Sequence, residues 1–246
     1  MSDPKALYLD LMTRIVTNTV YGDPNQSPWG KKIYQPNLRA DGRDWPMVAH
    51  TMVGQKRLEN LRQLCERAIV EGIPGDFIET GVWRGGSCIL MRAVLAAYAD
   101  QDRLVWCCDS FEGLPKPDPD KYPADAGDKH HIFTELAIPL EEVRDNFDRY
   151  GLLDDRTQFV KGLFRDTLHL LKAERFAVIR LDGDMYESTI QALEALYPKL
   201  SPGGFAIIDD YGAVPACKTA VEDFRIREGI TAPLQTIDWT GVWWQK

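Results

Sequence analysis

The sequence predicts an α/β fold built on a mostly parallel, seven-stranded sheet with helices on both faces and an antiparallel hairpin at its C-terminal end. From Pro74 onward, short β-rich segments alternate with helical segments, which is the pattern of a parallel sheet. Two predicted strands contain the continuously apolar runs 177–179 and 205–208, as strands covered on both faces do. The last two strands are separated only by the turn-like residues 238–241, so they form a hairpin.

The elements of this region follow one another closely along the chain. The first predicted strand, 77–80, leads through a glycine-rich turn into a helix over 86–98. The other strands are predicted at 104–109, 157–161, 176–182, 204–210, 234–237 and 242–244. The other helices are predicted near 140–149, 166–173, 188–198 and 214–227. With 246 residues, the chain accommodates all of them in one α/β domain with additions at its ends.

The N-terminal region, residues 1–73, has a different character from the rest. Apolar residues at helical spacing predict amphipathic helices over 1–18 and 50–71. Between them, residues 21–45 are rich in Pro, Gly, Asn and Asp without periodicity, which predicts a long loop; such loops in compact domains often act as lids. We therefore expect a single domain in which helices and a lid over 1–73 contribute to the active site of a core formed by residues 74–246.

Charge and composition exclude several classes of partner. The net charge is −8 at pH 7 and no stretch supplies a cluster of Lys and Arg, which argues against nucleic acid as a partner. The N-terminus lacks the pattern of a signal peptide, and no apolar run reaches the roughly 18 residues that span a bilayer, so a cytoplasmic protein without a membrane partner is expected. The five cysteines are an odd set without a C-x-x-C pair, which favours reduced, buried thiols over disulfides or a zinc cluster.

A glycine-rich turn after the first strand is typical of a site for a nucleoside-bearing cofactor. Gly81, Gly85 and Gly86 let the backbone approach a ligand closely, at a helix N-terminus whose free N–H groups bind a carboxylate or phosphate. Asp109 ends the second strand, where an acidic side chain accepts hydrogen bonds from ribose hydroxyls. The spacing G-x-x-x-G-G differs from the G-x-G-x-x-G of dinucleotide sites, so it favours S-adenosylmethionine over NAD. In the alternative interpretation, the glycines only make a tight turn.

Four carboxylates are predicted to converge at the ends of two neighbouring strands. Asp182 and Asp184 follow the fourth strand, and Asp209 and Asp210 follow the fifth. Parallel strands bring such ends together at the crevice where open α/β sheets bind ligands. Like charges gathered there repel one another unless a cation joins them, and oxygen ligands favour Mg²⁺ or a similar hard ion. In the alternative interpretation, these residues cap a helix and make a turn.

Several motifs resemble those of one known family. The chain is similar to the macrocin O-methyltransferase family in the segments ETGVWRGGS, DSFEG, RYGLLDD, RLDGDMYEST and LSPGGFAIIDDY, and the likeness covers nearly the whole chain. The resemblance implies a class I methyltransferase fold, which is Rossmann-like, and metal-dependent transfer of a methyl group from S-adenosylmethionine to a hydroxyl. The implied acceptors are sugars of macrolides and related natural products, so a role in antibiotic biosynthesis is expected.

The resemblance also implies which residues hold the metal and take the proton. Asp182, Asp209 and Asp210 would be the Mg²⁺ ligands. Asp184 would be the general base, although Asp182 itself is an alternative proton acceptor. From the residues alone, His131 in the long loop before the helix near 140–149 is our predicted acceptor contact or auxiliary base; the competing interpretation is a solvated loop histidine.

A larger set of residues is implied for the cofactor. The set comprises Thr51, Met52, Glu79, Thr80, Gly81, Val82, Gly85, Ser87, Asp109, Ser110, Gly162, Phe164, Arg165 and Asp182. The stretch 79–87 would hold the methionine end and Asp109 the ribose, while Phe164 and Arg165 would flank the adenine. One departure is Leu163, where members of the family often carry Trp, so that wall of the pocket is less well defined by the resemblance.

The sequence leaves three other functions open. A nicotinamide-dependent oxidoreductase is disfavoured by the glycine spacing, and a non-catalytic nucleoside-binding protein has no use for the four acids. In a catechol or phenol O-methyltransferase, the methyl transfer would be the same but the acceptor would be an aromatic hydroxyl and not a sugar. The loop over 22–45 matches the family least and would cover the acceptor. The resemblance therefore does not identify which glycosylated small molecule is methylated. The long N-terminal extension is also suited to pairing, and a homo-oligomer is among the expected states.

Overall fold

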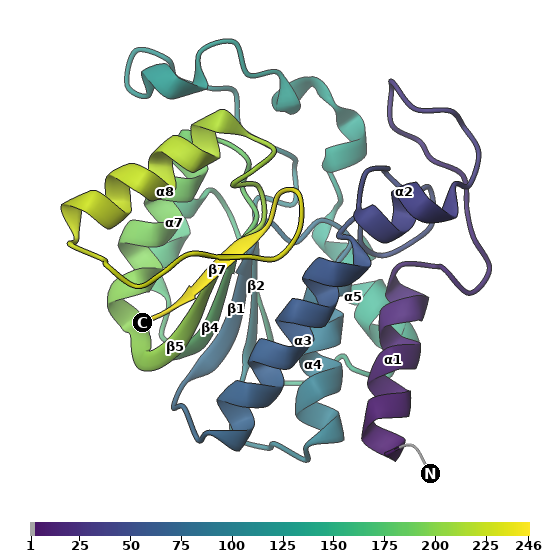
Figure 1. The fold of residues 1–246 in the computed structure, drawn as a ribbon. Helices are drawn as coiled ribbons and strands as arrows, with labels where there is room; N and C mark the ends of the chain where they lie inside the picture. The colour runs from purple at the N-terminus through teal and green to yellow at the C-terminus, as the bar shows by residue number, and fades with distance from the viewer. Residues whose placement is uncertain (1–2) are drawn as a thin grey trace.

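The computed structural model describes residues 3–246, and its centre is a seven-stranded sheet (Figure 1). The strand order is β3-β2-β1-β4-β5-β7-β6; β1 to β5 run parallel, and β7 pairs antiparallel with both β5 and β6. The strands are β1 Asp76–Thr80, β2 Val105–Asp109, β3 Thr157–Lys161, β4 Phe176–Leu181, β5 Leu200–Ile208, β6 Gln235–Thr236 and β7 Val242–Gln245. The predicted sheet with its C-terminal antiparallel hairpin is confirmed.

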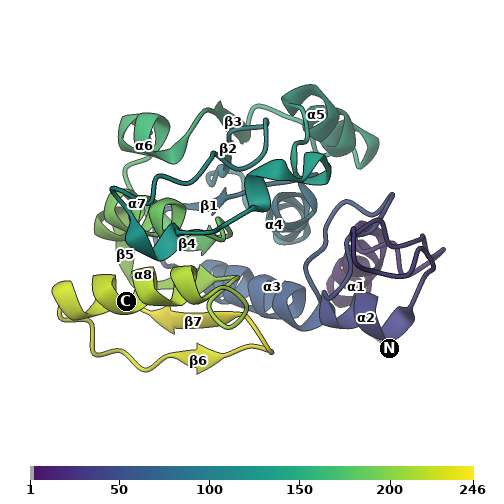
Figure 2. The ribbon, with the colours of Figure 1, turned by 90° about the horizontal axis from the view of Figure 1, so that it is seen from above.

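Helices cover both faces of this sheet (Figure 2). They are α1 Pro4–Val16, α2 Pro36–Asp41, α3 Gln55–Val70, α4 Gly86–Ala97, α5 Leu140–Arg149, α6 Phe164–Thr167, α7 Tyr186–Leu196 and α8 Pro215–Arg227. Successive side chains of β1 point to opposite faces: Phe77 packs into a core with α1, α3, α4 and α5, and Ile78 into a core with α7 and α8. Among residues 3–246, no helix is long and apolar enough to cross a membrane.

The predicted helix over 50–71 starts later than expected. Helix α3 begins at Gln55, after Gly54 at its N-cap. The backbone N–H groups of His50 and Thr51 donate to the carbonyl oxygen of Val16, at 2.8 and 3.2 Å. These contacts tie the segment before α3 to the end of α1, and they replace the helical hydrogen bonds that the periodicity suggested.

Two boundaries beyond the first helices also differ from the prediction. Strand β5 begins at Leu200, which pairs with Phe176, and not at residue 204. The predicted helix over 166–173 is a single α-helical turn, α6, followed by the 3₁₀ turn η4, Leu168–Leu170. Strands β4 and β5 end before their first aspartates, so these acids stand in the turns beyond the sheet and not within it.

The predicted loop over 21–45 is folded around a buried arginine. Arg39, on the unpredicted helix α2, is 1% exposed and forms ion pairs with Asp23 at 2.7 Å and Asp44 at 2.9 Å. Its Nη1 also donates to the carbonyl oxygen of Thr17 at 3.0 Å. A helix of six residues is too short to be stable alone. The long-range contacts of Arg39 stabilise it, and the periodicity of the sequence does not reveal such contacts.

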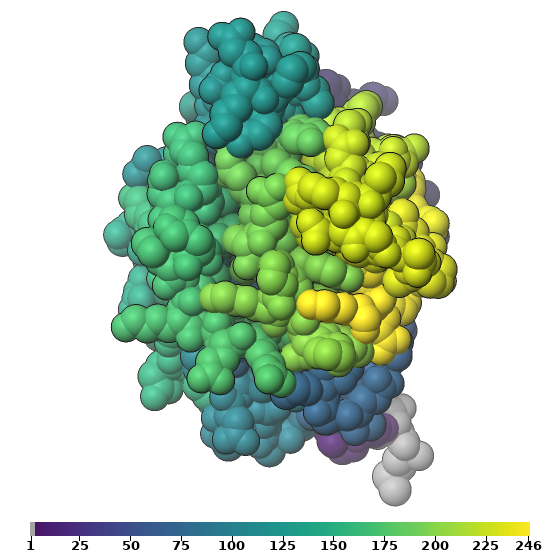
Figure 3. Space-filling view, turned by 90° about the vertical axis from the view of Figure 1, so that its left-hand side faces the viewer, coloured from purple at the N-terminus to yellow at the C-terminus, as the bar shows by residue number. Residues whose placement is uncertain are grey.

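A second long segment, residues 110–139, runs above α7 and α8 in Figure 1, and part of it forms the teal prominence at the top of Figure 3. It contains the 3₁₀ turns η1 Pro123–Asp125, η2 His130–Ile132 and η3 Thr134–Leu136. The buried carboxylate of Asp125 accepts hydrogen bonds from the backbone N–H groups of Tyr186 at 2.6 Å and Glu187 at 2.9 Å. This side chain therefore caps α7 and anchors the segment over the site.

Candidate active site

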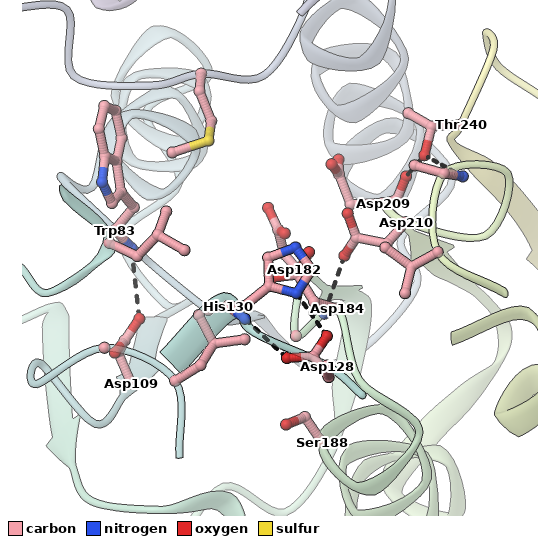
Figure 4. Close-up of a pocket in the computed structure, with 18 of the residues that line it drawn as sticks. Trp83, Asp109, Asp128, His130, Asp182, Asp184, Ser188, Asp209, Asp210 and Thr240 are labelled. Atoms are coloured by element: carbon pink, nitrogen blue, oxygen red, sulfur yellow. Dashed lines mark hydrogen bonds and ion pairs between the residues drawn. The ribbon is translucent and has the colours of Figure 1, made fainter. Parts of the chain in front are cut away.

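A cavity of about 670 Å³ opens at the carboxyl ends of the parallel strands. Its lining comes from the N-terminal region, the turns after β1 to β5, the segment before α5, the first turns of α7 and the turn between β6 and β7 (Figure 4). The position agrees with the rule that open α/β sheets bind ligands beyond the carboxyl ends of their strands.

Three aspartates meet in this cavity. Asp182 follows β4, and Asp209 and Asp210 follow β5; each offers a carboxylate oxygen, and these oxygens lie within 4.8 Å of one another. They are brought together because β4 and β5 are parallel neighbours with Leu181 paired to Ile208. Three carboxylate oxygens facing a cavity are the donor set that a hard divalent cation such as Mg²⁺ prefers, so these residues fit that ion.

Two buried arginines compensate the negative charge of these acids, and the sequence patterns predicted neither of them. Arg180, on β4, forms ion pairs with Glu79, Asp209 and, at 2.8 Å, Asp182. Arg57, on α3, forms an ion pair with Asp209. A signal for Arg180 was present, because an arginine inside the otherwise apolar run of β4 needs buried partners.

Burial and mutual repulsion raise the pKa values of three carboxylates in the cavity. Burial, followed by the neighbouring charge of Asp209, raises the pKa of Asp182 to about 8. Burial also raises the pKa of Asp184, against the opposing effect of His130, and that of Asp210, where Asp184 and Asp182 add to the effect. A cation bound among these groups would favour their ionised forms.

We expect the metal-free protein to lose stability as the pH rises from about 4 to about 8. The folded form keeps a proton on Asp182 up to a pKa of about 8, whereas the unfolded chain releases it near the ordinary value of 3.8. The folded form therefore binds more protons in this window, and the free energy of unfolding falls by up to about 1.4 kcal/mol per pH unit. Urea denaturation in EDTA, at several pH values, measures the slope. The slope should be shallower in Asp182→Asn; equal slopes would contradict the assignment.

Asp184 is held in an unusual backbone conformation beside the three aspartates. Its φ is 58°, in the left-handed region that non-glycine residues seldom adopt, and its N–H donates to Asp210 Oδ2 at 3.2 Å. Trp83 and Phe111, which follow β1 and β2 at the same end of the sheet, also have positive φ values, 47° and 54°. Such conformations cluster at functional sites, where surrounding contacts over-determine them.

The turn after β1 and the end of β2 form the side of the cavity predicted for the nucleoside. Gly81 has φ 84°, and a Cβ there would overlap the carbonyl oxygen of Asp182. The carboxylate of Asp109 accepts from the N–H groups of Val82 at 2.6 Å and Phe111 at 2.7 Å, which fixes its orientation. Burial raises its pKa, and these hydrogen bonds oppose that effect.

The predicted cofactor residues divide into two groups by position. Among the described residues, those that line the cavity are Met52, Gly81, Asp109, Ser110, Phe164, Arg165 and Asp182. The others, which are not among the residues that line the cavity, are Thr51, Glu79, Thr80, Val82, Gly85, Ser87 and Gly162. Leu163, the position at which this chain departs from the family, also lines the cavity.

Two of the residues outside the lining have structural partners of their own. Thr51 Oγ1 accepts from the N–H of Val53 at 3.1 Å. The carboxylate of Glu79 pairs with Arg180 and accepts from the thiol of Cys88 at 2.8 Å. These contacts hold both side chains in place.

The structure places His130, and not the predicted His131, at the cavity. His130 lines the cavity, and its Nδ1 lies 2.6 Å from Asp128 Oδ2. Burial lowers its pKa, but the charges of Asp184 and Asp128 outweigh that effect and raise it. His131 has its Nδ1 buried without a hydrogen-bond partner and is not among the described residues that line the cavity. The two neighbours project differently from the turn η2, which sequence alone does not reveal.

The turn between β6 and β7 reaches the site, which the sequence analysis missed. Thr240 Oγ1 donates to the carbonyl oxygen of Asp209 at 2.8 Å, and Asp238 Oδ2 accepts from Arg57 Nε at 3.0 Å. Trp239 Nε1 donates to the carbonyl oxygen of Asp41, at the end of α2, at 2.8 Å. The turn therefore joins the acidic site to the N-terminal region.

A sheet of this order, with a glycine bend after β1 and an acid at the end of β2, is the framework of the class I S-adenosylmethionine-dependent methyltransferases. Within that class, the chain belongs to the Macrocin-O-methyltransferase (TylF) family, whose profile matches residues 25–246. It is therefore an S-adenosylmethionine-dependent O-methyltransferase of a family that serves natural-product biosynthesis.

Individual relatives agree with this membership. The chain is 54% identical, over 99% of its length and 94% of the relative's, to the 8-demethyl-8-(2,3-dimethoxy-alpha-L-rhamnosyl)-tetracenomycin-C 4'-O-methyltransferase of Streptomyces olivaceus. It is 48% identical, over 98% of its length and 96% of the relative's, to the mycinamicin III 3''-O-methyltransferase of Micromonospora griseorubida. The solved structure of the O-methyltransferase NovP superposes with a TM-score of 0.94 at 48% identity, covering 98% of this chain and 99% of NovP.

Proposed function

We propose that this enzyme methylates a hydroxyl of a sugar carried by a natural product, with Mg²⁺ held by Asp182, Asp209 and Asp210. The observation that carries the proposal is the meeting of these three carboxylates, within 4.8 Å, in the cavity that Gly81 and Asp109 also line. The sugar is supported by the names of the relatives, which methylate rhamnosyl tetracenomycin and mycinamicin III.

The cofactor is proposed to lie along the turns after β1, β2 and β3. Asp109 would accept hydrogen bonds from the ribose hydroxyls, since its carboxylate is already oriented by backbone N–H groups. Phe164 and Arg165 would flank the adenine, and the bend at Gly81 would receive the methionine end. Met52 also lines the cavity, which suits a position near the sulfonium. The predicted residues outside the cavity lining would act by shaping the bend.

The acceptor hydroxyl must lose a proton as its oxygen attacks the methyl carbon. When bound, the metal would supply positive charge that stabilises the developing negative charge on that oxygen. Asp184 is the proposed proton acceptor, because it faces the cavity from a constrained backbone and is not one of the three ligands; Asp182 is the alternative. Alignment of oxygen, methyl carbon and sulfur in the cavity would contribute on the order of 7 to 11 kcal/mol.

The N-terminal region is proposed to complete the active site, as its predicted role requires. Trp29, Trp45, Met52 and Arg57 all line the cavity, although they precede the first strand of the sheet. The buried Arg39 holds this region in one shape. Residues 1–73 would therefore form the wall that faces the acceptor, over a core of 74–246 that holds cofactor and metal.

The charge of the cavity favours a neutral acceptor over a sugar attached to a nucleoside diphosphate. The lining carries eight carboxylates, from Asp44, Asp109, Asp128, Asp182, Asp184, Glu187, Asp209 and Asp210, against the three guanidinium groups of Arg43, Arg57 and Arg165. Two of these arginines are paired, Arg57 with Asp209 and Arg165 with Glu187. Of the three, only Arg43 has no ion pair among the described residues, so the lining offers a diphosphate little positive charge that is not already paired. A finished glycoside is the better acceptor.

Removal of the metal should abolish methyl transfer reversibly. Labelled S-adenosylmethionine would be incubated with the protein and an O-rhamnosylated aromatic polyketide, and the products analysed by mass spectrometry. We expect a gain of one methyl group, loss of turnover in EDTA, and recovery when Mg²⁺ is restored. Full activity in EDTA would remove the metal from the proposal. Methylation of a catechol in preference to all glycosides would favour the phenol alternative.

The cellular location and the assembly state stay predictions. The sequence favours a cytoplasmic enzyme, and its N-terminal extension is suited to pairing into a homo-oligomer. Helix α1 presents the exposed side chains of Leu7, Leu11 and Ile15 on one stripe, which is compatible with pairing.

A further inference from the structure

Three aromatic rings meet at the mouth of the cavity and join two segments that are far apart in sequence. Trp29 lies 4.7 Å from Trp45 and 5.7 Å from Phe133, and the latter two lie 5.4 Å apart, measured between ring centroids. The interplanar angles are 69°, 76° and 78°, so every pair is edge-on. We call this cluster the aromatic corner.

The corner is accessible to a ligand. Trp29 is 65% exposed although it lines the cavity, while Trp45 and Phe133 are half-buried. A large part of the Trp29 indole is therefore open to solvent, although two rings pack against it. An exposed ring of this size at the rim of a cavity is a common mark of a binding surface, since its burial releases water from a large apolar area.

The corner lies outward from the acidic site, along the same cavity. Asp209 and Asp210 are buried, at 4% and 9% exposure, whereas Trp29 belongs to the rim. His130, which lines the cavity together with Asp128, approaches Phe133 with a ring distance of 6.4 Å. Trp29 and Trp45 line the same cavity as the three aspartates, so a glycoside whose sugar hydroxyl reaches the aspartates can place its aglycone against the corner.

We infer that the aromatic corner is the subsite for the aglycone and that it takes a planar aromatic ring system. The inference rests on the proposed function, because it needs a glycoside whose sugar occupies the acidic site. Offset stacking on an indole face adds a specific attraction for planar π systems beyond the burial of apolar area. The corner itself contributes no charged side chain, which suits a neutral, flat aglycone. A flexible aliphatic ring would bury apolar area there but could not stack on the indole.

The test compares two glycosides of the same sugar by calorimetry, in the presence of Mg²⁺ and S-adenosylhomocysteine. One is an anthraquinone O-rhamnoside, and the other is cyclohexyl rhamnoside. The wild type should bind the anthraquinone glycoside more tightly. Trp29→Ala should weaken that binding by about two- to tenfold from the loss of stacking and leave the cyclohexyl glycoside nearly unchanged. Trp29→Phe, which keeps a ring, should retain most of the preference.

Tyr21→Ala is the matched control, because Tyr21 is 91% exposed, belongs to the same N-terminal region and is not among the described residues that line the cavity. This variant should bind both glycosides as the wild type does. The inference is overturned if the wild type shows no preference, or if Trp29→Ala weakens both glycosides equally. Failure of the proposed function would look different, since it would be an absence of methylated product while the difference in binding persisted.

Discussion

Substitution of Asp209 by asparagine is expected to lower kcat/KM for methyl transfer by at least about a thousandfold while the enzyme still binds S-adenosylhomocysteine. Asp209 belongs to the acidic triad and is 4% exposed. The amide is nearly isosteric, but it lacks the charge that a hard cation requires. Loss of a metal that supplies several kcal/mol of transition-state stabilisation corresponds to this change in rate.

The two readouts for Asp209→Asn are product formation across a range of Mg²⁺ concentrations and calorimetric titration with S-adenosylhomocysteine. Asp145→Asn, an exposed aspartate on α5, is the matched control and should behave as the wild type. Unchanged turnover in Asp209→Asn would exclude a metal at this position. Loss of cofactor binding would mean that the residue supports the fold of the pocket and not the metal.

Replacement of Arg180 by methionine is expected to be the most destabilising single change in the sheet. Its guanidinium is 1% exposed and pairs with Glu79, Asp182 and Asp209. Removing one partner of a buried ion pair leaves uncompensated charge, at a cost of roughly 3 to 5 kcal/mol. For a domain of this size, the melting temperature should fall by about 6 to 20 °C.

Differential scanning calorimetry in EDTA measures the effect of Arg180→Met without a contribution from metal. Arg67→Met is the control, because Arg67 pairs with Glu71 while both side chains are more than 40% exposed, and such pairs contribute less than about 1 kcal/mol. Addition of Glu79→Gln to Arg180→Met should recover part of the loss, because one unpaired charge is then removed. A melting temperature equal to that of the wild type would show that the three acids are not compensated by this arginine.

Local patterns were sufficient for the framework of the protein. The alternation of strands and helices after Pro74 predicted the parallel sheet, and the run before Asp182 and Asp209 predicted strands that end at these acids. Side-chain periodicity and the positions of glycines are local properties, and parallel strands necessarily bring their carboxyl ends to one edge. The sequence could therefore indicate that the four aspartates lie close together.

The surroundings of those aspartates depend on contacts that no local pattern contains. Arg57 reaches Asp209 across 152 positions and Asp238 across 181. The choice of His130 over His131 follows from the direction in which one 3₁₀ turn projects its side chains into the cavity.

The sequence by itself determined the sheet, the glycine bend and the acids at the strand ends, because each follows from periodicity and from the ends of parallel strands. Tertiary structure alone decided which arginines balance those acids, which histidine lines the cavity and how the residues around Arg39 fold. Burial of charge is the physical reason: a buried arginine is stable only where several distant segments place their oxygens around it.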